Sequence, residues 1–130
     1  MSLALSMDFQ QNTTIEKAWS ALTDSKMLAK WITENDFKPI VGHRFQFRHQ
    51  PSEYWDGIVN GEVLIVEEPY RLSYSWATGD ERHTITWTLQ DLGQGKVNLH
   101  LEQTGFSAPY GLEGAKHGWM EWFGRFEQVL

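Results

Sequence analysis

Period-two alternation of apolar and polar side chains, repeated in consecutive segments between residues 44 and 103, constrains the fold most strongly. Successive side chains of a β-strand point to opposite faces of a sheet, so this alternation predicts strands with one buried and one solvated face. Turn-forming sequences at 68–69, 78–81 and 91–95 separate the segments. Five such strands predict an antiparallel meander, whose apolar face carries Phe45, Phe47, Leu72, Tyr74, Trp76, Ile85, Trp87, Leu89, Val97, Leu99 and Leu101.

A sheet with one apolar face needs a second layer to cover it. Residues 115–130 supply this layer, because helical spacing places one set of apolar side chains on a single face: Ala115, Trp119, Trp122, Phe123, Phe126, Val129 and Leu130. Gly118 and Gly124 interrupt the helix, and we expect them to permit close approach to the sheet. A curved sheet wrapped around this helix leaves space between the two layers.

The N-terminal segment adds one strand and two short helices. Residues 3–10 alternate loosely and predict the first strand. Thr13 and Glu16 have the spacing of a capping box, so we expect a helix that starts after Thr13, and a second helix over residues 25–32. The chain is therefore predicted to be a single α+β domain over residues 1–130. Its curved, six-stranded antiparallel sheet wraps around a long C-terminal helix, with two short helices after the first strand.

Charge and composition exclude several classes of function. Eleven Lys and Arg against seventeen Asp and Glu give a net charge of −6, so the basic footprint of a nucleic-acid-binding protein is missing and we expect no such partner. There is no Cys, and the five His lack metal-ligand spacing, so we expect no metal and no cofactor. No segment reaches the roughly 20 apolar residues that span a bilayer, so we expect no membrane insertion and a cytoplasmic location.

Short motifs along nearly the whole chain are similar to those of one protein family. They are Ala18 to Asp24 in the first helix and turn, Leu28-Ala29-Lys30-Trp31 in the second helix, Phe37 to Phe45 before the second strand, Gly57 to Trp76 in a long hairpin, and the pairs Gly105-Phe106 and Gly118-Trp119. In this order they resemble the START-like, Bet v 1-like (SRPBCC) helix-grip superfamily, and most closely the activator of heat-shock protein 90 ATPase homologue family. His43, where a second Gly is common, and a shorter segment between Phe106 and Trp119 depart from the pattern.

The resemblance implies an internal cavity between the sheet and the C-terminal helix, but no single activity, because the superfamily includes ligand binders, cyclases and co-chaperones. Aromatic residues make up 14% of the chain, and rings from different elements are expected to converge on the concave side. The expected ligand-binding residues are Trp31, Phe45, Phe47, Trp55, Tyr74, Trp76, Thr84, Phe106, Trp119 and Phe123.

Three classes of function remain open from the sequence. The favoured one is non-catalytic binding of a small hydrophobic molecule, lipid-like or aromatic, in that cavity. The second is a co-chaperone-like interaction module, which leaves a chaperone partner and a homodimer open. The third is a cyclase- or hydrolase-type enzyme, which a buried pair of acidic and His side chains in the cavity would favour. No catalytic residues are assigned, because Glu53 and Asp56 lie in a charged loop that is expected to face water.

Overall fold

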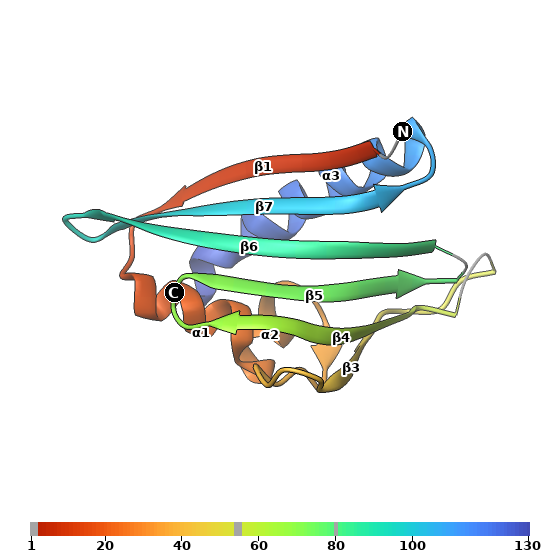
Figure 1. The fold of residues 1–130 in the computed structure, drawn as a ribbon, viewed down its shortest axis with the longest axis horizontal. Coiled ribbons are helices and arrows are strands. Elements are labelled where there is room, and N and C mark those ends of the chain that lie inside the picture. Colours follow the sequence, from red (N-terminus) through yellow and green to blue (C-terminus); the bar gives the residue numbers. More distant parts are fainter. Residues whose placement is uncertain (1–2, 54–55, 80) are drawn as a thin grey trace.

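The computed structural model describes residues 3–53, 56–79 and 81–130, and Figure 1 shows its fold. A strand is followed by two helices, six further strands and one long helix. The elements are β1 (Leu3–Gln11), α1 (Ile15–Thr23), α2 (Ser25–Trp31), β2 (Glu34–Asn35), β3 (Arg44–Arg48), β4 (Ile58–Glu67), β5 (Arg71–Thr78), β6 (Glu81–Gly93), β7 (Lys96–Phe106), α3 (Pro109–Phe126) and the 3-10 turn η1 (Glu127–Val129).

All strands belong to one antiparallel sheet in the order β1-β7-β6-β5-β4-β3-β2. The predicted helix-grip fold is confirmed, including the meander from β3 to β7 and the two short helices after β1. The sheet has seven strands instead of the expected six, because β2 adds a short edge strand in which Glu34 pairs with Arg48 and Asn35 with Phe47. Two residues are too few to show alternation in the sequence.

Helix α1 begins one residue later than the sequence predicted. Its N-cap is Thr14, whose Oγ1 accepts a 3.2 Å hydrogen bond from the backbone N–H of Lys17. The residue three positions after the cap is therefore Lys17 instead of Glu16, and the expected capping box is wrong. The cap itself still satisfies one of the free N–H groups of the first turn. Helix α2 is capped in the same way by Asp24, which accepts from Lys26 and Met27.

The core lies between the sheet and a layer formed by the helices. Figure 1 shows α3 behind the sheet, where it runs along β1 and β7. The Phe123 ring of α3 stacks on Phe9 of β1 with 3.8 Å between ring centroids. Trp31 of α2 is fully buried and packs edge-on against Phe126. No helix among the described residues combines the length and apolar character needed to cross a membrane.

Gly61 of β4 gives the Phe45 ring its place in the core. The two residues face each other across β3 and β4, and a Cβ at Gly61 would overlap the ring and the backbone oxygen of Ser75. The Phe45 ring of β3 thus lies over Gly61 of β4, which has no side chain. Gly61 therefore leaves room for the buried Phe45 ring.

Candidate functional site

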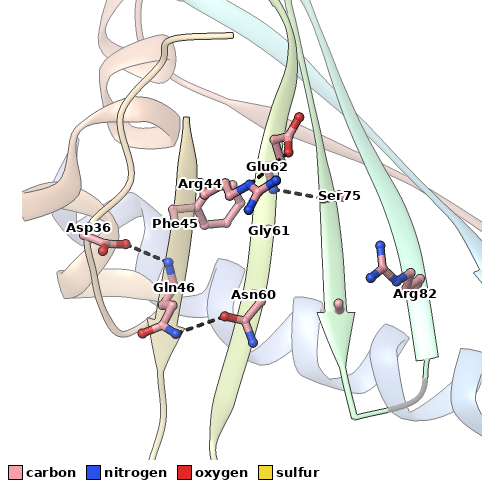
Figure 2. A pocket seen from close by; sticks show the side chains of 10 residues that line it. Asp36, Arg44, Phe45, Gln46, Asn60, Gly61, Glu62, Ser75 and Arg82 are labelled. Carbon is pink, nitrogen blue, oxygen red and sulfur yellow. Dashed lines mark hydrogen bonds and ion pairs between the residues drawn. The ribbon is translucent and has the colours of Figure 1, made fainter. Parts of the chain in front are cut away.

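One large hollow lies on the outer face of the sheet and is lined mainly by polar side chains. Figure 2 shows its side chains in front of β3, β4, β5 and β6, with α3 behind these strands. The hollow measures about 560 Å³. Its side chains mostly bind one another: Gln46 donates to Asn60 at 3.0 Å, and Arg44 pairs with Glu62 at 3.4 Å. The Arg44 side chain is 87% exposed, so this pair contributes little. Phe45 and Ala77 also line this hollow, but charged and polar side chains make up most of its wall.

A second hollow, here called the cleft, lies between the sheet and the middle of α3 and measures about 280 Å³. Its walls come from the end of β3, from β4, β5 and β7, and from α3. They are formed by His49, Val59, Trp76, Thr78, Gln103, Gly114, Ala115, Gly118, Trp119 and Trp122. Concave sites with mostly apolar walls and a few polar groups are the usual form of small-molecule sites. The cleft is therefore the candidate functional site.

Small residues of α3 leave the cleft open: Gly114, Ala115 and Gly118 line it. The buried residues of this helix are Trp119, Phe123 and Phe126, all in its second half. Gly114 and Gly118 are one helical turn apart and both line the cleft, and a Cβ at either position would meet no atom within 4 Å. The expected close approach at Gly118 and Gly124 is thus wrong, since neither glycine has a neighbour that near. At Gly118 the missing side chain contributes open space.

Three indole rings form the walls of the cleft. Trp76 of β5 lies 6.0 Å from Trp119 and 6.2 Å from Trp122, measured between ring centroids. Trp119 and Trp122 meet at 4.9 Å and 89°, so the two rings form a corner. On the other side of Trp122 the His49 ring stacks at 5.7 Å and 7°. Flat rings in this arrangement offer stacking faces to a planar ligand.

Burial lowers the pKa of His49 below its usual range, because desolvation disfavours the imidazolium form. His49 is half-buried at the end of β3. Its ring is therefore neutral at neutral pH and presents an uncharged, flat wall. Removing more water from this ring would disfavour its charged form further.

A series of hydrogen-bonded side chains starts at the inner wall of the cleft. The Trp119 Nε1–H donates to Gln103 Oε1 at 2.8 Å, and Gln103 Nε2 lies 2.7 Å from His83 Nδ1. Indole N–H is a donor only, so Gln103 must present its oxygen to Trp119 and its NH₂ to His83. His83 Nδ1 is then an acceptor, which makes the ring neutral with its proton on Nε2. Gln103 is 3% exposed, and its carboxamide is held from both ends.

Behind Gln103 this series of polar side chains continues to the carboxylate of Glu81. His83 Nε2 is buried and lies 3.5 Å from Glu81 Oε1, without hydrogen-bond geometry. Glu81 Oε1 also accepts from the hydroxyl and the backbone N–H of Ser107, at 2.7 and 2.9 Å. These bonds, the hydroxyl first, lower the pKa of the Glu81 carboxyl. The pair of His83 and Glu81 is the kind that would favour an enzyme, but neither residue lines the cleft.

Of the ten residues expected to bind ligand, Trp76 and Trp119 line the cleft. The Phe45 ring packs edge-on against Phe47 at 5.5 Å and against Tyr74 at 5.4 Å. Edge-to-face packing at these distances is the geometry of a filled core. These three residues therefore lie inside the core and do not line the cleft.

The remaining expected residues lie elsewhere. Trp31 and Phe123 are buried 5.2 Å apart in the core, and Phe106 packs against His83. Thr84 is exposed on the outer face, because it alternates with the buried His83 and Ile85 along β6. The expectation that Thr84 lines the cavity is therefore wrong. Trp55 lies outside the described residues.

Gln103, Gly114 and Gly118 line the cleft, although none of them was expected to do so from the sequence. A signal for Gln103 was present, because it continues the apolar face of β7 two residues after Leu101. His83 stands in the same relation to Ile85 on β6. A polar residue in phase with buried apolar positions must find a hydrogen-bond partner inside the protein, so such positions indicate internal polar networks. Among the described residues no group of three or more His, Cys, Asp or Glu could hold a metal ion.

Known structures resemble this one over nearly its whole length. The protein MLL2253 from Mesorhizobium loti has a TM-score of 0.86 and 34% sequence identity, with 98% of this chain and 96% of that chain covered. The protein BH1534 from Bacillus halodurans has a TM-score of 0.79 and 26% identity, with coverage of 98% and 96%. PFC0360w, an HSP90 activator from Plasmodium falciparum, has a TM-score of 0.79 and 18% identity, with coverage of 97% and 94%.

The family comparison agrees with the fold. No curated protein matches the chain. The family model of the Activator of Hsp90 ATPase homolog 1-like proteins matches residues 12–130, which include the helices, the meander and the cleft. The chain therefore belongs to the Activator of Hsp90 ATPase homolog 1-like family, as the sequence motifs indicated.

Proposed function

We propose that this protein binds a small, planar apolar molecule in the cleft, without catalysing a reaction. The observation that carries the proposal is the set of three indole walls, from Trp76, Trp119 and Trp122, around an open space of about 280 Å³. This volume is near the lower end of the range for small-molecule sites, so it suits a ligand of two or three fused rings better than a long lipid. Burial of the ligand's apolar surface, at about 25 cal/mol per Å², supplies the driving force.

Binding without chemistry is supported by the residues in the cleft. The described lining residues include no Asp, Glu, Lys or Arg, and the nearest pair of His and carboxylate, His83 and Glu81, lies behind Gln103. General acid–base catalysis needs a proton donor or acceptor within hydrogen-bond reach of the substrate. His49 is the imidazole among the described lining residues, and in the proposed binding mode its ring, stacked on Trp122, acts as a flat wall of the cleft.

The experiment is a calorimetric titration with uncharged aromatic molecules, sterols and fatty acids, using the wild type and two glycine variants. Gly118→Leu adds a side chain to the wall of the cleft, whereas Gly124→Leu makes the same change on the same helix outside it. We expect a ligand that binds the wild type and Gly124→Leu, and whose affinity falls at least tenfold in Gly118→Leu.

If no member of the panel binds the folded wild type, the proposal fails. The co-chaperone-like alternative then takes first place, and it would be tested by binding to a heat-shock protein 90 chaperone. If a ligand binds equally well to both variants, binding occurs outside the cleft, and the proposed site is wrong.

A further inference from the structure

Among the described residues, no charged side chain lines the cleft. Its polar side chains among the described residues are His49, Thr78 and Gln103, and none of them is an acid or a strong base. His83, behind Gln103, accepts at Nδ1 and is neutral in this arrangement. The Glu81 carboxylate lies 3.5 Å from His83 Nε2, and its negative charge would repel an anion. Moving an ionised group into such a site without a partner costs far more than moving a neutral group.

One of the two N–H donors of the Gln103 side chain has no partner among the described residues. A carboxamide has two N–H donors, and Gln103 Nε2 has a single partner among the described residues, His83 Nδ1. Its oxygen is turned toward Trp119, and its nitrogen toward His83, so the amide cannot rotate without losing both bonds. The side chain lines the cleft while being almost fully buried. A donor that is fixed in advance loses little entropy when it binds.

We propose that the second Nε2–H of Gln103 binds a carbonyl oxygen of the ligand. The cleft then selects uncharged, planar aromatic carbonyl compounds over both hydrocarbons and carboxylates. This inference rests on the proposed function and names the ligand class for the same site. Gln103 is its specificity-determining residue, and the bonds from Trp119 and to His83 position it.

Three naphthalenes of nearly equal shape test the proposal in the wild-type protein. The probes are 2-acetylnaphthalene, which has a carbonyl oxygen, 2-isopropenylnaphthalene, which replaces this oxygen by CH₂, and 2-naphthoate, which is charged. One hydrogen bond in a desolvated site predicts that the acetyl compound binds about tenfold more tightly than the isopropenyl compound. We expect 2-naphthoate to bind more weakly than both, measured by calorimetry at pH 7.5.

The variant Gln103→Met removes the donor and keeps the length of the side chain. We expect it to bind both neutral probes with the affinity that the wild type has for 2-isopropenylnaphthalene. The substitution also leaves Trp119 Nε1 and His83 Nδ1 unpaired, which threatens folding. A second readout therefore uses the wild type alone: the side-chain NH₂ resonances of Gln103 in an NMR titration should shift with the acetyl probe and much less with the isopropenyl probe.

The outcomes separate this inference from the proposed function. If the two neutral probes bind equally well, or 2-naphthoate binds best, the assigned role of Gln103 is wrong while the cleft remains a binding site. If the Gln103 resonances respond equally to both neutral probes, the role is wrong as well. If no probe binds and the wider panel also fails, both proposals are overturned.

Discussion

Replacing Gly118 of α3 by Ala is expected to stabilise the protein. A glycine in a helix interior costs about 1 kcal/mol relative to Ala, because it loses more backbone freedom on folding. A Cβ at Gly118 would meet no atom within 4 Å, so the added methyl group brings no steric cost that would offset the gain. Gly124 has the same open surroundings and lies outside the cleft, so Gly124→Ala is the matched control.

An increase of about 1 kcal/mol in the free energy of unfolding should raise the Tm by about 4 °C for a domain of this size. Urea denaturation and calorimetry of the wild type, the two single variants and the double variant provide the measurement. We expect similar gains from the two single changes and near-additive gains from both together. A loss of stability in Gly118→Ala alone would show that α3 needs close approach at this position, and would refute the open space that defines the cleft.

Three further predictions concern single side chains. Trp119→Ala should lower the free energy of unfolding by about 3–5 kcal/mol in urea denaturation, because the buried ring packs 5.5 Å from Trp87. Ser107→Ala should destabilise the protein at neutral pH, and the difference from the wild type should shrink as the pH falls below the usual pKa of a Glu carboxyl. The lowered pKa of Glu81 gives stability that is present above the usual pKa and is lost as the pH falls through the folded value. A bound ligand should bury His49 further, so the calorimetric affinity for a neutral ligand should fall as the pH drops from 8 to 5, and His49→Phe should flatten this profile.

The sheet could be predicted because its signal is local and repeated. Strands β3, β5, β6 and β7 alternate over several residues, and a strand shifted by one position would expose its whole apolar face. The sequence also predicted that the C-terminal helix covers the apolar face of the sheet, because this helix carries a long apolar stripe. Alternation cannot reveal a strand that is too short to repeat it. The two residues of β2 are such a strand.

Helix boundaries were predicted less well, for a related reason. Thr13 and Thr14 offer the same hydroxyl, so the sequence gives two adjacent candidates for the cap of α1. The choice depends on backbone geometry: Thr14 has extended φ and ψ angles and accepts from Lys17, whereas Thr13 is buried. Sequence spacing of Thr13 and Glu16 was therefore a weaker guide than the conformation of the residue that precedes the first helical turn.

The position of the cleft could not be read from the aromatic residues, because rings fill space as readily as they enclose it. Phe45, Phe47 and Tyr74 occupy the middle of the apolar face and pack edge-on against each other. Open space occurs instead where side chains are absent, beside Gly114 and Gly118 in the middle of α3. The informative sequence pattern for a cavity in this fold is thus a pair of glycines one helical turn apart on the covering helix. A polar residue in phase with the apolar face of the strand opposite, as Gln103 is, completes the pattern, because it gives the open space a fixed hydrogen-bonding group.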